Sequence, residues 1–167
     1  MEKALEIVGG KSPLEKYFED ETISDNAHRK LETVNFLAIP AKYVDGEFYY
    51  AQETINFIKF CRQNDPDHSF DVLSDGDVKL RSLHSFDIWL PIIWVATEVL
   101  LPIAINVVST FISDKLKGRE KEEANVDVTM IVKRENEEKT IHYHGDAKTF
   151  KESFEKIDLN KMLGKNA

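Results

Sequence analysis

The run HYHGD at 142–146 places His142, His144 and Asp146 within five residues. Side chains two positions apart project to the same side of a strand, and imidazole and carboxylate groups are zinc ligands. The same pattern is typical of an ordinary strand that faces solvent. A catalytic zinc needs a third protein ligand and an open position, and the sequence alone places none of the candidates there, which are His68, His84 and Asp127.

A second group of possible ligands lies in the acidic stretch 63–85, which contains Asp65, Asp67, His68 and Asp71. A calcium-binding loop of twelve residues requires Gly at its sixth position and Glu at its twelfth. Counting from Asp65 gives Phe70 and Gly76 at these positions. The stretch is therefore interpreted as a solvated acidic loop.

Other catalytic patterns fail at specific positions. Gly10-Lys11-Ser12 resembles the end of a phosphate-binding loop, but Leu5 stands where that motif needs its first glycine. Cys61 follows an apolar run in an expected helix, where burial disfavours the thiolate that a nucleophile requires. The sequence thus nominates no catalytic residue and no cofactor.

Charge and composition limit the classes of partner. The 167 residues include 22 Lys and Arg against 30 Asp and Glu, a net charge of −8, and the basic residues form no patch suited to a phosphate backbone. A nucleic-acid partner is therefore not expected. A single cysteine permits no disulfide within one chain, and charges interrupt every apolar run at the N-terminus, which favours a cytoplasmic location.

The most apolar stretch is LPIIWVATEVLLPIAINVV at 90–108, which is long enough to cross a bilayer. Glu98, Asn106 and two prolines oppose insertion, and the basic residues that follow would require the charged N-terminal part to cross the membrane. We expect instead a central hydrophobic helix whose first turn contains Pro91 and which is kinked near Pro102. A membrane-acting protein that inserts segment 86–112 is the alternative.

Trp89 and Trp94 lie in the first half of this expected helix. Residues five apart on a helix point about 140° from each other, so both cannot face one sheet. One tryptophan is then expected at the surface of a monomer, where large aromatic residues favour protein contacts. This predicts that the chain binds another protein or a second copy of itself.

Shorter elements surround this helix. The sequence predicts a short helix over 13–21, a strand over 33–43 that lies at a sheet edge or ends near Pro40, a buried helix over 48–63 and a small hairpin whose turn is Asp75-Gly76. Residues 126–134 and 139–144 alternate as two paired strands, with Val132 opposite Ile141 and Met130 opposite Tyr143. A helix over 147–163 then covers their apolar face, with Phe150, Phe154, Ile157 and Met162 directed inward.

These elements predict an α+β fold with a small mixed or antiparallel sheet, the central hydrophobic helix and a C-terminal ββα unit. We expect one domain, 1–167, made of a polar helical segment (1–32), a middle part (33–118) and the ββα unit (119–167). The leading hypothesis is a non-enzymatic cytosolic protein that acts by protein–protein interaction, as an oligomer or a complex subunit. Membrane insertion of 86–112 and a metal-dependent hydrolase using His142 and His144 are the alternatives.

Overall fold

A computed structural model describes the backbone of residues 5–10, 25–42, 48–73, 80–81, 88–118, 123–134 and 137–155. It describes the side chains of residues 29–40, 49–73, 88–118, 123–133 and 138–153. The expected helix over 13–21, the turn at Asp75-Gly76 and the positions of Ile157 and Met162 lie outside these ranges.

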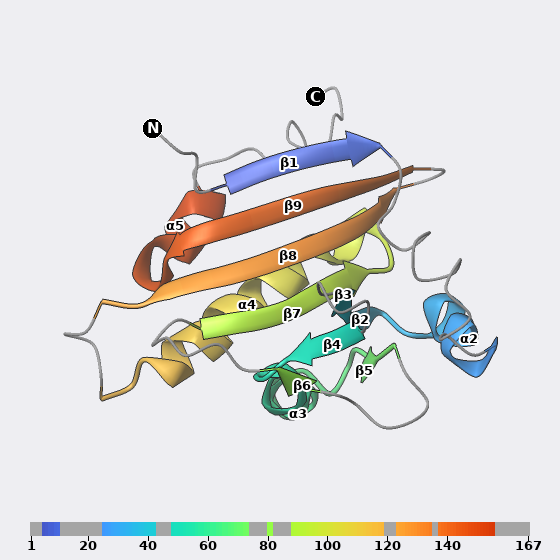
Figure 1. Ribbon diagram of the computed structural model, residues 1–167, viewed down its shortest axis with the longest axis horizontal. Coiled ribbons are helices and arrows are strands. Elements are labelled where there is room, and N and C mark those ends of the chain that lie inside the picture. Colours follow the sequence, from blue (N-terminus) through green and yellow to red (C-terminus); the bar gives the residue numbers. More distant parts are fainter. Residues whose placement is uncertain are drawn as a thin grey trace.

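Within the described ranges, six strands form the main sheet, in the order β1-β9-β8-β7-β2-β5. Figure 1 shows the four longest strands lying side by side above β2. Their bounds are β1 Leu5–Gly10, β2 Phe36–Ile39, β5 Phe70–Val72, β7 Ile88–Val95, β8 Asn125–Arg134 and β9 Glu137–Asp146. β7 pairs in parallel with β8, and β2 pairs in parallel with β5, whereas the other neighbours are antiparallel. The sheet is therefore mixed.

A smaller sheet has the order β3-β4-β6. Its strands are β3 Ala41–Lys42, β4 Phe48–Ala51 and β6 Leu80–Arg81. β5 and β6, the two strands on either side of Asp75-Gly76, pair with different partners, β2 and β4, so the expected hairpin is wrong. The strand signals in both segments were correct, but short parallel pairings with distant strands replace the local one.

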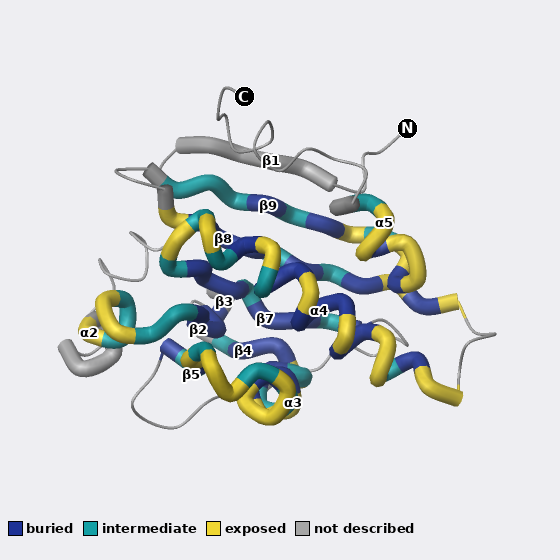
Figure 2. The backbone as a smooth tube through the Cα atoms, turned by 180° about the vertical axis from the view of Figure 1, so that it is seen from behind, coloured by how far each residue is buried: buried dark blue, intermediate teal, exposed yellow. Residues whose placement is uncertain are grey.

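The helical elements are α2 Asp25–Thr33, α3 Thr54–Asn64, α4 Leu101–Lys115 and α5 Phe150–Glu155, with short 3₁₀ turns η1 Glu98–Leu100 and η2 Ala147–Thr149. Seen from behind, α3, α4 and α5 lie in front of the sheet (Figure 2). The helix expected over 48–63 begins only at Thr54, because the aromatic run before it forms β4. The N-terminal segment expected to be helical also contributes a strand, β1.

The α+β class, the long central helix and the C-terminal strands followed by a helix are confirmed. The central helix, however, is α4 alone. Residues 88–95, expected as its first half, form β7 in the middle of the sheet. A central strand covered on both faces reads as a continuous apolar run, which explains why it resembles a buried helix.

Both prolines of this segment have definite positions. The pairing between β7 and β8 shifts between Trp89 and Ile92, so Pro91 lies in a β-bulge, where its missing N–H does not break the ladder. Pro102 lies in the first turn of α4, where that N–H has no helical partner. The expected kink at Pro102 is therefore wrong, since the helix begins there.

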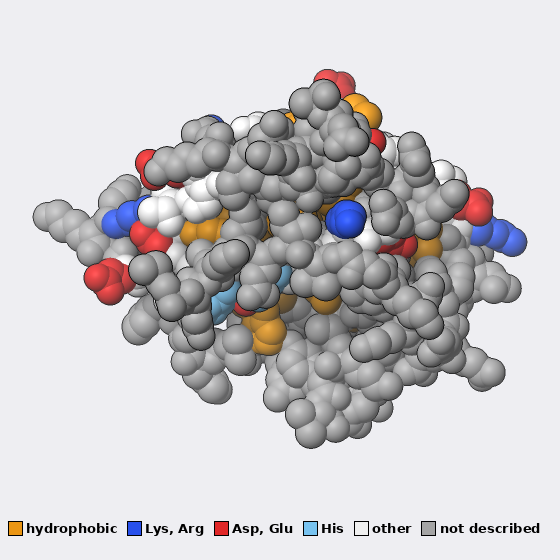
Figure 3. Space-filling model, turned by 90° about the horizontal axis from the view of Figure 1, so that it is seen from above, with side chains coloured by type: hydrophobic (Ala, Val, Ile, Leu, Met, Phe, Trp, Pro, Cys, Tyr) orange, Lys and Arg blue, Asp and Glu red, His pale blue; other side chains and the backbone are white. Residues whose placement is uncertain are grey.

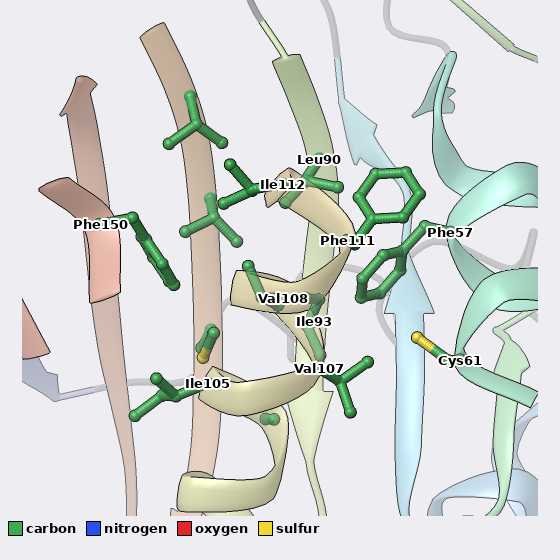
Figure 4. Close-up of a cluster of buried hydrophobic side chains, with 14 of the residues drawn as sticks. Phe57, Cys61, Leu90, Ile93, Ile105, Val107, Val108, Phe111, Ile112 and Phe150 are labelled. Carbon is green, nitrogen blue, oxygen red and sulfur yellow. The ribbon is translucent and has the colours of Figure 1, made fainter. Parts of the chain in front are cut away.

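The larger core lies between the sheet and the three helices. Figure 4 shows Phe57, Phe111 and Phe150 directed into it from α3, α4 and α5. Phe57 and Phe111 meet edge to face with ring centroids 5.2 Å apart. Outside the core, Lys115 of α4 pairs with Glu53 at the start of α3 at 2.9 Å, so the two helices are joined by both apolar and charged contacts.

The opposite face of the sheet carries a smaller apolar cluster of Leu37, Ile39, Leu73, Trp94 and Ile131. On β8, Val126, Val128, Met130 and Val132 belong to the larger core, so the strand alternates as expected. Ile141 and Tyr143 of β9 face the same core. This alternation leaves Asp127, Thr129, His142 and His144 on the other face.

Candidate functional site

The two histidines of the H-x-H pair share one carboxylate, that of Asp127 on the neighbouring strand. In the ladder between β8 and β9, Asp127 is opposite His144 and Thr129 is opposite His142. His142 Nε2 lies 3.2 Å from Asp127 Oδ2, and His144 Nδ1 lies 3.0 Å from the same oxygen. The strand geometry therefore creates a three-residue cluster, which we call the Asp127 cluster.

The Asp127 cluster is open to water. The exposed fractions of the side chains are 33% for Asp127, 38% for His142 and 59% for His144. Figure 3 shows histidine side chains at the surface beside acidic side chains in the view from above. At this exposure an ion pair contributes at most about 1 kcal/mol. One nitrogen of each imidazole is held in a hydrogen bond with the Asp127 carboxylate.

Asp146, the third residue proposed from the sequence, has a different partner. Its Oδ1 accepts a hydrogen bond from the backbone N–H of Lys148 at 3.2 Å, which caps η2. Its backbone carbonyl accepts another from the Tyr143 hydroxyl at 2.8 Å. Within the described part of the chain, no group of three or more His, Cys, Asp or Glu side chains is arranged to hold a metal ion.

Asp127 is the residue that sequence reasoning left unplaced. Only the pairing register between β8 and β9 shows that Asp127 lies beside the two histidines. The sequence predicted the correct faces of the two strands but paired Met130 with Tyr143, whereas Met130 pairs with Ile141. A shift of two residues preserves every face and changes every partner, so Asp127 moves opposite His144.

Trp89 and Trp94 lie on β7, so the argument that placed them on opposite sides of a helix is wrong. Trp89 pairs with Asp127 and Trp94 with Ile131, and these two positions of β8 share a face. The bulge supplies the extra residue that brings tryptophans five apart to one side of a strand. Trp94 is 2% exposed and belongs to the smaller apolar cluster, whereas Trp89 is half-buried.

The acidic loop contains local ion pairs. His68 Nδ1 lies 2.8 Å from the Asp65 carboxylate. Asp71 pairs with Lys30 at 3.2 Å and with Arg62 at 3.4 Å. These contacts join α2 and α3 to β5, which is a structural role.

The described apolar surface is concentrated where α4 begins. Val99 is 77% exposed and is the only large hydrophobic residue among the described side chains that is exposed. Pro102 is also exposed and Ile103 is half-buried. We call these three residues the α4 entry patch. A pocket of about 390 Å³ adjoins it, lined by Pro102, Ile103 and Val107 together with Asn64, Asp65, Asn106 and Thr110.

None of the described helices is both long enough and apolar enough to span a membrane. The stretch 86–112 that suggested insertion contains the strand β7, the 3₁₀ turn η1 and residues 101–112, which are most of α4.

Comparison of the chain with models of protein families finds no matching family, and comparison with curated proteins and with solved structures finds no match either.

Proposed function

We propose that this protein is a non-enzymatic cytosolic protein that acts by protein–protein contact through the α4 entry patch, in its simplest form with a second copy of itself. The observation that carries this proposal is the 77% exposure of Val99 beside Pro102 and Ile103. Most apolar side chains of the described fold are buried, so the patch is an exception to the pattern of this chain.

The surroundings of the patch suit an interface. Asn64, Asn106 and Thr110 line the adjoining pocket, and all three are exposed. An apolar centre with a polar, solvent-accessible border is the usual arrangement at protein contacts. The amide and hydroxyl groups can form hydrogen bonds at the border while the apolar centre is removed from water.

The charge of the patch favours a second copy as the partner. The chain has a net charge of −8, so most pairs of surfaces on two copies would repel each other. Among the described residues that line the adjoining pocket, Asp65 is the only charged one, and His68 pairs with it at 2.8 Å. A two-fold contact brings a patch against itself, which a nearly uncharged patch permits.

The cytosolic location is supported by the one cysteine. Cys61 is free and buried, which suits a compartment where thiols stay reduced.

Sedimentation velocity of the purified chain at about 0.15 M salt tests the proposal. We expect a dimer at micromolar concentration, and Val99→Asp should raise the dissociation constant at least tenfold, because a charge would be buried at the centre of the contact. Val99 is exposed, so the substitution should leave the unfolding transition unchanged.

Lys117→Gln is the matched control for Val99→Asp. It changes the net charge by the same amount at an exposed residue, and it lies beyond the opposite end of α4. The control should dimerise like the natural chain. A monodisperse monomer at all concentrations would contradict the self-association proposed here, and equal effects of the two variants would show that charge, not the patch, controls assembly.

A further inference from the structure

The pocket that adjoins the α4 entry patch has walls that an occupant can contact. Its volume is about 390 Å³, within the range of binding pockets, about 300 to 1,000 Å³. Among the described residues that line it, only Val107 is buried, at 6% exposure, whereas Asp65 and Ile103 are half-buried and the others are exposed. A side chain that entered the pocket would therefore meet accessible surface on most sides.

The lining suits a small uncharged group. Ile103 and Val107 supply apolar surface at the α4 side. The Asp65 carboxylate is 18% exposed, and its two oxygens lie 2.8 and 3.0 Å from His68 Nδ1, so its charge is already paired. The Thr110 hydroxyl donates to the backbone carbonyl of Asn106 at 2.9 Å, one turn earlier in the helix.

The exposed apolar side chain and the pocket lie along one helical run. The turn η1 leads directly into α4, and Val99, Ile103, Asn106 and Thr110 are spaced by three or four residues, which places them on the same face. At about 1.5 Å per residue, Val99 lies about 5 Å before the middle of the Pro102–Ile103 pair and Asn106 about 5 Å beyond it. The entry patch thus has its most exposed side chain on one side of this pair and the pocket on the other.

We infer that Val99 of each copy fills the adjoining pocket of the other, about a two-fold axis beside Pro102 and Ile103. A two-fold axis perpendicular to a helix reverses its direction, so a residue one turn before the axis lies against the residue one turn after it. Val99 of one copy is then opposite Asn106 of the other, at the pocket. This inference rests on the self-association proposed above and adds which surfaces meet.

A second copy accounts for the exposed side chain and the pocket together. Among the described side chains, Val99 is the one large hydrophobic residue that is exposed, at 77%. In the reciprocal contact each chain inserts one apolar side chain and receives one, so both features are removed from water at once. A contact of this kind closes at two copies. An unrelated protein would have to supply an apolar side chain for the pocket and, separately, a cover for Val99.

Two variants disable the two halves of the contact separately. Val99→Asp removes the inserted apolar group, and Thr110→Trp fills the pocket from its own wall. Each should raise the dissociation constant of the dimer at least tenfold in sedimentation velocity, because each defect occurs twice in a dimer. Ser113→Trp is the control: it adds the same side chain at an exposed position of α4 outside the pocket lining and should dimerise like the natural chain.

A mixture of the two variants tests whether Val99 meets the pocket of the other copy. A Val99→Asp chain still offers an open pocket, and a Thr110→Trp chain still carries Val99, so one of the two contacts is intact between them. Fluorescently labelled Val99→Asp should therefore bind excess Thr110→Trp at least threefold more tightly than it binds excess Val99→Asp. The mixed dimer should also be tighter than the dimer of Thr110→Trp alone.

Urea unfolding establishes that each variant folds. Thr110 is exposed, and its substitution removes the one printed hydrogen bond of its hydroxyl, to the Asn106 carbonyl. If Thr110→Trp is destabilised, Asn106→Trp replaces it in both experiments, since Asn106 is also exposed and also lines the pocket.

The outcomes separate this inference from the proposed dimer. If the natural chain dimerises while the mixture gains nothing, or while Thr110→Trp dimerises normally or Ser113→Trp is weakened equally, the pocket does not receive Val99; the inference is then overturned and self-association stands. Species that grow beyond a dimer with concentration would indicate head-to-tail contacts and would overturn the two-fold axis. A natural chain that stays monomeric contradicts the proposed function, and this inference with it.

Discussion

At the scale of single residues, burial decides the chemistry of Cys61. The side chain is fully buried, and burial raises the pKa of its thiol well above its usual range, with the nearby Asp65 carboxylate adding to the effect. A thiol held in its neutral form is a poor nucleophile. Cys61 therefore serves as a small apolar side chain in the larger core.

This shift of the Cys61 pKa predicts a loss of stability in alkaline solution. The unfolded thiol ionises near pH 8.5, while the folded thiol stays protonated, so above about pH 8.5 the folded state binds the additional proton. Its contribution is complete below the unfolded pKa and decreases as the pH rises, by about 1.4 kcal/mol for each pH unit. Urea unfolding at pH 7.5 and 9.5 measures this decrease.

Cys61→Ala is the control for the alkaline effect, because it removes the titrating group while all lysines and tyrosines remain. The natural chain should lose about 1 kcal/mol more than the variant between the two pH values. An equal loss in both would mean that the thiol ionises freely in the folded protein.

The Asp127 cluster shows at the same scale what a sequence pattern can predict about a site. Alternation on two strands was enough to place His142 and His144 on one face, away from the core. It was not enough to identify Asp127 as their partner, because period-two alternation is unchanged by a register shift of two. The ladder places Lys133 opposite Glu138, and such a pair of opposite charges favours the observed register.

At the scale of elements, β7 shows where sequence reasoning failed. Its apolar run, two tryptophans and internal proline suited a buried helix as well as a strand. Only the tertiary structure distinguishes a strand from a helix here, because β8 pairs with one edge of β7 and β2 with the other. The bulge accommodates Pro91. By contrast, the second half of the stretch forms the expected helix, α4.

The faces of β8 can be tested by two adjacent substitutions. Met130 is fully buried in the larger core, whereas Thr129 is half-buried on the opposite face, across from His142. Met130→Asp should lower the free energy of unfolding by several kcal/mol, about 3 or more, because it buries an unpaired charge. Thr129→Asp should change it by less than about 1 kcal/mol, since the new carboxylate lies beside an imidazole.

Urea denaturation followed by circular dichroism measures both variants of β8 against the natural chain. Similar losses at positions 129 and 130 would contradict the assignment of the two faces. A larger loss at Thr129 would require β8 to be displaced by one residue, which would turn Thr129 toward the helices.

At the scale of the whole molecule, the net charge of −8 opposes the dimer proposed above, while the α4 entry patch favours it. The two contributions differ in range. Contact between apolar groups is local, whereas the repulsion between two copies acts over the Debye length, about 30 Å at 0.01 M salt and about 8 Å at 0.15 M. Ionic strength should therefore change the repulsion far more than the contact.

We accordingly predict that dimerisation strengthens when sodium chloride is raised from about 0.01 M to 0.15 M, as measured by sedimentation velocity. Lys117→Glu makes the chain more negative by two units, far from the patch, and should weaken association at the lower salt concentration with little effect at the higher one. Val99→Asp should weaken it at both, because it acts within the contact. Dimerisation that instead weakens as salt is added would indicate ion pairs across the interface, and the uncharged entry patch would then be the wrong surface.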